Sequence, residues 1–152
     1  MAQTSTAITA CDVGFWIDNA AGTPTDVGGS TNKVTVNLNK ETLGMLRTFG
    51  SRFPTRYECG KDTIIDFNVV YSTSATEAFQ ILKNWWNEDD PGARTVKVYM
   101  PKKNVGADVY SGEFRLQNLP LPSEAGSSSP VMVSGQLLIT GALALTKPHS
   151  AR

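Results

Sequence analysis

Apolar and polar residues alternate along most of the chain, and this pattern predicts a mainly β protein. Between residues 63 and 72, Phe67 and Val69 fall on one face of an extended segment, and Asp66 falls on the other. Strands are expected over residues 13–17, 33–39, 63–72, 95–100, 109–116 and 131–145. The last of these is long enough to span a whole sheet.

One amphipathic helix is expected after the strand that ends near residue 72. Ser74 and Glu77 have the Ser-x-x-Glu spacing of a capping box, which predicts a helix over about residues 75–88. Its apolar side chains recur at helical spacing and would share one face: Ala78, Phe79, Leu82, Trp85 and Trp86. Because two tryptophans bury a large area, this helix is expected to cover an open side of the sheet.

A long segment without regular periodicity, residues 39–61, separates two of the strands and is called the arm below. Glycines and a proline interrupt it, yet it carries six large apolar side chains: Leu43, Met45, Leu46, Phe49, Phe53 and Tyr57. A loop of this length within one domain is uncommon and often functional. We expect an extended arm whose apolar residues bury against another subunit. A short helix or strand within the segment is the alternative.

These elements together predict one domain, residues 1–152, that is a β-sandwich or barrel with one flanking helix and a long loop or arm. The N-terminus, about residues 1–7, and the tail, about residues 146–152, are polar and expected to be loose. Residues 1–10 lack the basic start and apolar stretch of a signal peptide, so synthesis in the cytoplasm is expected. No run of about 18 apolar residues is present, so we expect no membrane-spanning helix.

The composition offers little for catalysis. His149 is the only histidine and lies in the polar tail, which argues against Ser–His–Asp and Cys–His nucleophiles and against common zinc sites. Cys11 and Cys59 lie far apart in the sequence, and two reduced cysteines are the simplest interpretation. No enzyme activity, metal or cofactor is therefore expected. The formal net charge of zero argues against a general nucleic-acid coat and does not oppose self-association.

Two acidic residues allow one further interpretation. Asp66 and Glu113 could flank a sugar, as glycosidase carboxylates do, if their strands were neighbours. A polar sheet face is the simpler role for both residues. A small β-sandwich that binds carbohydrate stays open as an alternative, with Trp16 as an aromatic platform.

The order of three strand motifs resembles a known family. RTVKVYMP (Arg94 to Pro101) precedes DVYSGEF (Asp108 to Phe114), and VSGQLLITG (Val133 to Gly141) follows near the end of the chain. This order, with the single helix before it, resembles the tail tube, or major tail, proteins of tailed double-stranded DNA bacteriophages. The resemblance covers about residues 34–145. Tube or adaptor proteins of contractile injection machines and head–tail joining proteins are the alternatives.

The resemblance implies a structural protein of the virion tail, made and assembled in the host cytoplasm, and no enzyme. Such proteins form hexameric rings that stack into a tube through which DNA passes, without binding it specifically. Further partners would be the tape measure, terminator and distal tail proteins, with no membrane partner. The arm would then contact a neighbouring ring or subunit. Acidic or neutral polar side chains would suit the channel wall, since they do not hold phosphates, and the candidates are Asp66, Asn68, Glu113 and Gln117.

Overall fold

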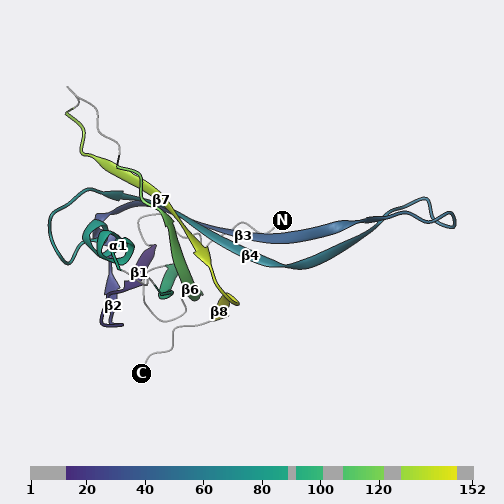
Figure 1. Ribbon diagram of the computed structural model, residues 1–152, viewed down its shortest axis with the longest axis horizontal. Coiled ribbons are helices and arrows are strands. Elements are labelled where there is room, and N and C mark those ends of the chain that lie inside the picture. The colour runs from purple at the N-terminus through teal and green to yellow at the C-terminus, as the bar shows by residue number, and fades with distance from the viewer. Residues whose placement is uncertain (1–12, 89–91, 101–107, 122–127, 147–152) are drawn as a thin grey trace, which may run out of the picture.

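The computed structural model describes residues 13–88, 92–100, 108–121 and 128–146, without the side chains of residues 41–43, 58–59 and 146 (Figure 1). The described elements, in chain order, are β1 (Gly14–Asp18), β2 (Pro24–Asp26), the 3-10 turn η2 (Gly28–Ser30), β3 (Thr31–Leu46), β4 (Thr55–Val70), α1 (Ala78–Trp86), β5 (Arg94–Met100), β6 (Asp108–Asn118), β7 (Met132–Ile139) and β8 (Ala144–Thr146). The predicted mainly β fold with a single helix is confirmed for these residues.

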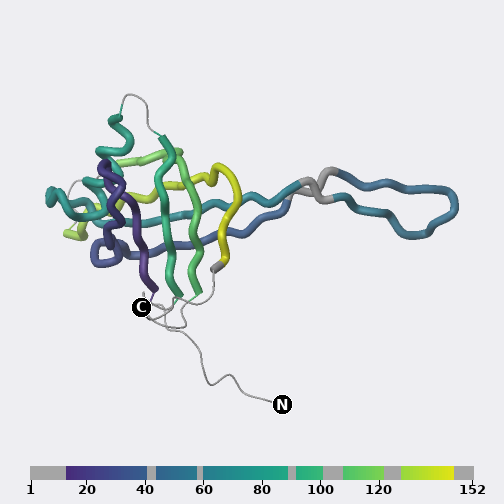
Figure 2. Tube along the Cα trace, turned by 90° about the horizontal axis from the view of Figure 1, so that it is seen from below, coloured from purple at the N-terminus to yellow at the C-terminus, as the bar shows by residue number. Residues whose placement is uncertain are grey.

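The strands form one antiparallel sheet in the order β2-β1-β5-β6-β7-β4-β3, and β8 also pairs with β6. Strand β6 belongs to two layers. One edge of β6 pairs with β5 from Asp108 to Phe114, whereas its other edge pairs first with β8 and then, from Phe114 onward, with β7. Strands β1, β5 and β8 consequently cross over β3, β4 and β7 (Figure 2). The sheet thereby folds over itself and encloses a core.

The core lies between the two layers and is closed by α1. Both layers and the helix contribute fully buried side chains, which include Phe15, Ile17, Ile65, Phe67, Val69, Phe79, Leu82, Trp85, Val96, Val98, Phe114, Val133 and Leu137. In β4 the buried residues alternate with partly exposed Ile64, Asp66 and Asn68. The face assignment predicted for this strand is therefore correct.

Helix α1 is shorter than predicted and begins without the expected capping box. Glu77 is the N-cap residue but makes no side-chain cap bond, and the Ser74 hydroxyl lies 3.3 Å from that of Thr76. The first helical N–H, from Ala78, instead donates to Ser30 Oγ at 2.9 Å. A residue distant in the sequence therefore satisfies this helix end, which a local motif cannot reveal.

The apolar face of α1 also differs from the prediction in one position. Trp85 is buried and donates its indole N–H to the Gly92 carbonyl at 3.0 Å, whereas Trp86 is 64% exposed. Ile81 is buried in its place. Successive helical residues point about 100° apart, and the stripe of buried residues that ends at Trp85 does not extend to Trp86.

Two chain segments are divided more finely than predicted. The long strand expected over residues 131–145 ends at Ile139, because the chain turns at Gly141 with φ of +96° before β8 begins. Between the strands expected over residues 13–17 and 33–39, the structure has a further short strand, β2, which pairs with β1. The expected loose ends and the Cys11 thiol lie outside the described residues, apart from the backbone of Thr146 in β8.

Replacing Gly135 with Ala is expected to destabilise the fold by about 1–3 kcal/mol, because the added methyl group overpacks the core. A Cβ atom there would lie 2.5 Å from the Asn118 carbonyl oxygen and 2.5 Å from the Phe67 ring. The control is Gly60→Ala, where a Cβ would meet nothing within 4 Å. Urea unfolding should show a lower midpoint for Gly135→Ala and a change within about 0.5 kcal/mol for Gly60→Ala. Equal midpoints for the two variants would contradict this packing.

Candidate assembly surfaces

The arm is a two-stranded β-ribbon rather than an irregular loop. Strands β3 and β4 remain paired from Asn39 opposite Asp62 out to Leu46 opposite Thr55. At about 3.4 Å per residue, this paired part extends roughly 24 Å beyond Asn39. Figures 1 and 2 show the ribbon leaving the body from one end only. The predicted arm is therefore present, and its backbone groups are satisfied by the ladder between its two strands.

The apolar side chains of the arm are exposed. Phe49 is fully exposed and Phe53 is 79% exposed, while Met45, Leu46 and Tyr57 are about half exposed. The side chain of Leu43 lies outside the described residues. An isolated two-stranded ribbon is marginally stable in water, and this one buries no core of its own along its outer part. These residues are therefore available to a partner, as the sequence pattern suggested.

The tip of the arm, residues 44–57, is also basic. It contains Arg47, Arg52 and Arg56 and no acidic residue. Ser51 Oγ holds the turn by contacting the backbone oxygen of Phe53 at 3.0 Å and accepting from its N–H at 3.2 Å. The tip thus combines apolar side chains with positive charge on a locally ordered turn.

The polar face of β3, β4 and β7 carries two of the four channel-wall candidates. The Asp66 carboxylate accepts hydrogen bonds from Asn37 Nδ2 at 2.7 Å and from Gln136 Nε2 at 2.8 Å, and so links three strands. Asp66 and Asn68 line an open groove of about 700 Å³ together with Lys33. This face is polar and nearly balanced in charge.

The other two candidates lie elsewhere on the sheet. Glu113 is exposed on β6 and lines a groove of about 210 Å³ with Asp18 and Arg94, and Gln117 is exposed farther along β6. Strand β7 separates β4 from β6, so Asp66 and Glu113 are not on neighbouring strands. The structure therefore does not bring these two carboxylates together as a glycosidase-like pair.

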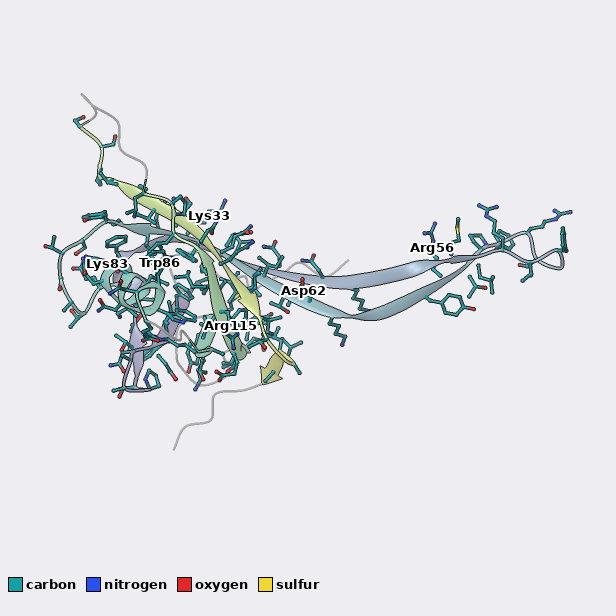
Figure 3. All side chains as sticks on the ribbon, in the orientation of Figure 1. Lys33, Arg56, Asp62, Lys83, Trp86 and Arg115 are labelled. Atoms are coloured by element: carbon teal, nitrogen blue, oxygen red, sulfur yellow. The ribbon has the colours of Figure 1, made fainter. Side chains whose placement is uncertain are left out.

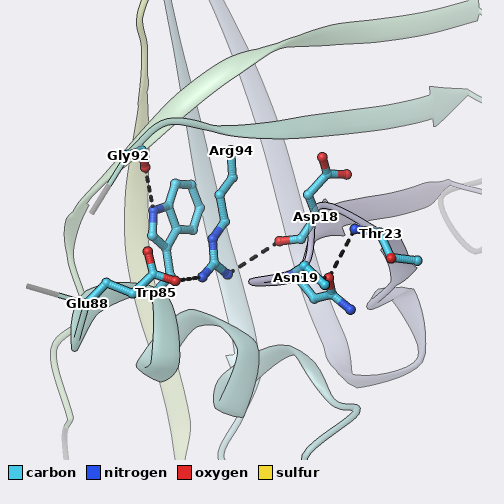
Figure 4. Close-up of polar contacts among 8 residues, drawn as sticks. Asp18, Asn19, Thr23, Trp85, Glu88, Gly92 and Arg94 are labelled. Carbon is cyan, nitrogen blue, oxygen red and sulfur yellow. Dashed lines mark hydrogen bonds and ion pairs between the residues drawn. The ribbon is translucent and has the colours of Figure 1, made fainter. Parts of the chain in front are cut away.

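The groove at Glu113 is organised by a buried arginine (Figure 4). Arg94 is 7% exposed, pairs with the Glu88 carboxylate, and donates to the Asp18 backbone oxygen at 3.4 Å. Its guanidinium lies 5.2 Å from the ring centroid of Trp85. Glu88, at the end of the helix predicted over residues 75–88, neutralises this buried charge, while Asp89 and Asp90 lie outside the described residues.

Asp18 is the acidic group of this groove whose titration is perturbed. Burial and the nearby Glu113 carboxylate raise the pKa of Asp18 above its ordinary value of 3.8, while Lys97, Thr95 and Arg94 oppose the shift.

Burial also raises the pKa of Tyr99, which packs edge-on against Trp16. Trp16 is therefore engaged with a strand neighbour and only partly exposed, which weakens its case as a sugar platform.

Two apolar grooves were not found from the sequence. The helix groove, of about 590 Å³, lies between α1 and the segment after β6 and is lined by Tyr71, Phe79, Lys83, Trp86, Asn87, Leu119 and Leu121. The root groove, of about 340 Å³, lies at the base of the arm and is lined by Leu38, Asn39, Lys40, Lys61, Thr63, Ile139, Gly141, Ala142, Leu143 and Leu145. No local motif marks either groove, because each joins residues that are distant in the sequence.

Figure 3 shows how far apart the arm and the helix groove lie. Arg56 is far out on the arm, whereas Trp86 and Lys83 lie on α1 at the opposite end of the molecule.

Among the described residues, no group of three His, Cys, Asp or Glu side chains is placed to hold a metal ion. No helix in the described part of the chain is both long and apolar enough to cross a membrane.

The fold is similar to that of several solved tube assemblies. A chain of the tail of an empty gene transfer agent particle, solved with C6 symmetry, matches with a TM-score of 0.68 and 15% identity, covering 92% of this chain and 99% of that one. The SPP1 tail tube matches at 0.69 and 9% identity, covering 94% and 82%. A chain of the PVC contractile injection system's sheath–tube complex matches at 0.68 and 12% identity, covering 93% and 94%.

These likenesses extend over more than nine-tenths of the chain. No family model matches the sequence, and no curated protein matches it either. The chain therefore shares its fold with subunits of tail tubes and injection-system tubes, and this confirms the fold that the strand motifs implied.

Asp18→Asn is expected to stabilise the fold at pH 7. Because the folded chain raises the pKa of Asp18, its ionised form costs more free energy in the folded than in the unfolded state. This cost is present above the folded pKa and disappears once pH falls below 3.8, where both states are protonated. Urea midpoints of variant and wild type should differ most at pH 7 and converge near pH 3.

The same measurement in a Glu113→Gln background provides the control. There the gain from Asp18→Asn should be smaller, since part of the repulsion is already removed. A gain that grows as the pH falls would overturn this account of the groove.

Proposed function

We propose that this chain is the structural subunit of a phage-type tail tube, which assembles as stacked six-membered rings around a channel for DNA. The observation that carries the proposal is the likeness to tube subunits over more than nine-tenths of the chain. The six-fold ring follows the C6 symmetry of the gene transfer agent tail. On this proposal the chain is located in the virion tail and has no enzymatic role.

The free edges of the sheet support assembly. Strand β3 is 16 residues long, and among the described strands it pairs with β4 alone. At the other end of the sheet, β1 is the one described strand that pairs with β2. Long unpaired edges tend to pair with other chains, and a closed ring of subunits covers them. Homo-oligomeric stacking therefore satisfies both the sheet edges and the exposed arm.

The channel wall is proposed to be the polar face that carries Asp66 and Asn68. Its side chains are polar and nearly neutral, so the wall would neither bind phosphates tightly nor exclude them strongly. Glu113 and Gln117 are exposed on β6, which pairs with β7, and we propose that they extend this wall. The further partners in a virion would be the tape measure, terminator and distal tail proteins.

The tube of a contractile injection system is the second candidate. The likeness to the PVC sheath–tube complex, at a TM-score of 0.68, supports it as strongly as the likeness to phage tails. The fold is common to both classes, so the cargo of the particle must distinguish them. Mass spectrometry should find the chain in DNA-filled virions if the first proposal holds, and in DNA-free particles if the second holds.

The purified wild-type chain is expected to form rings or tubes at high concentration, visible by negative-stain electron microscopy. The double variant Phe49→Ser, Phe53→Ser should abolish assembly. Both side chains are exposed in the isolated subunit, so their replacement removes contacts between subunits and not contacts within one. The urea midpoint of this variant should stay within about 0.5 kcal/mol of the wild type. A wild-type chain that remains monomeric at every concentration contradicts the proposed function.

A lysine placed on the channel wall is expected to make assembled tubes retain DNA. Gln117→Lys adds one exposed charge per subunit, hence six in each ring, and salt-sensitive binding should follow. The control, Asn84→Lys, adds the same charge on the exposed side of α1. Nuclease protection of DNA by Gln117→Lys tubes alone supports the proposed wall. Equal retention by both variants argues that β6 does not face the channel.

A further inference from the structure

The helix groove presents an apolar surface with a wide opening. Trp86 is 64% exposed and Leu121 is 60% exposed, and Tyr71 is nearly half exposed beside them. Tyr71 packs over Phe79 with ring centroids 4.3 Å apart, so an aromatic layer continues from the core to the groove wall. Large exposed side chains clustered in a concave site are characteristic of a protein-binding surface.

The tip of the arm has the chemistry that fits this groove. Phe49 and Phe53 are its most exposed apolar side chains, and aromatic side chains are frequent anchors in interface pockets. The tip arginines also suit the groove, because an arginine can lie over the exposed face of Trp86. The fold already contains this pairing one residue earlier, where Arg94 lies 5.2 Å from the Trp85 ring centroid.

The arm of one molecule cannot reach its own helix groove. The two lie at opposite ends of the long axis, and the arm points away from the body (Figures 1 and 3). A contact between them must therefore join two copies. Such a contact uses different surfaces on the two partners, and repeats from copy to copy into rings or filaments.

Electrostatics favours the helix groove over the root groove as the site for a basic tip. Lys61 lies on the root groove and Lys83 lies on the helix groove, so each groove carries a lysine that opposes the tip arginines. The helix groove differs in that it lies beside the C-terminal end of α1, at Trp86 and Asn87. The negative end of the helix dipole attracts cations there.

We propose that the helix groove receives the arm tip of a second copy, with Phe49 or Phe53 packed against Tyr71, Trp86 and Leu121. The inference rests on the proposed function, because it names the partner surface of the arm within the tube. It assigns the exposed Trp86 to assembly rather than to the core.

A photo-crosslinking amino acid at position 49 tests this pairing in assembled tubes. Unlabelled chain carrying p-benzoylphenylalanine is mixed with ¹⁵N-labelled wild type, assembled, irradiated, and digested with trypsin. The probe should couple to the labelled tryptic peptide 84–94, which contains Trp86. The mixed isotopes show that the link joins two copies.

The position of the crosslink separates the two proposals. Tubes in which the probe couples instead to peptide 34–40, at the root groove, overturn the helix-groove inference and leave the proposed function standing. Tubes in which neither this probe nor the same probe at position 53 couples to a tryptic peptide that carries Tyr71, Trp86 or Leu121 have the same consequence. A wild-type chain that forms no rings or tubes overturns both proposals.

A pair of variants matched in exposure provides an independent test. Trp86→Lys and Leu145→Lys place the same charge in the helix groove and the root groove, at residues 64% and 61% exposed. Both should keep the wild-type urea midpoint. Trp86→Lys removes the aromatic contact and repels the tip arginines, so it is expected to raise the concentration needed for assembly at least tenfold, whereas Leu145→Lys should change it less than twofold. The reverse order of effects would contradict the inference.

Discussion

The architecture depends on the way β6 is shared between two layers. Up to Phe114 the strand continues the layer of β1 and β5, and from Phe114 onward it pairs with β7 and so joins the layer of β3 and β4. One continuous sheet can then enclose a core from two sides, with α1 closing the remaining opening. The close approach of β7 to the end of β6 at Gly135 depends on the same arrangement, because the Asn118 carbonyl occupies the space of a side chain.

The arm follows from this architecture but is not stabilised by it. Strands β3 and β4 have a buried face only where they belong to the second layer, and beyond Asn39 they continue as a ribbon held by their own ladder. Such a ribbon gains little from burial in the isolated subunit. Its exposed aromatic side chains therefore contribute free energy only when another molecule covers them.

The sequence predicted what depends on local periodicity. The faces of the 63–72 strand were assigned correctly, because alternation between Phe67 and Asp66 reports burial directly. The strands of the arm escaped recognition because neither face of the ribbon is buried, so no alternation is selected there. The helix start was misplaced since its partner, Ser30, is distant in sequence. The grooves could not be predicted, since they join α1 to residues beyond β6 and the arm's base to the end of β7.

The arm leaves the molecule at one end only, and this gives any stack of these subunits a direction. One terminus of such a polymer would display projecting ribbons and the other would display vacant receptors. The two termini would therefore differ in chemistry, and growth could proceed at one of them while a different protein caps the other. The polarity of the finished tube would then originate in the asymmetry of a single hairpin.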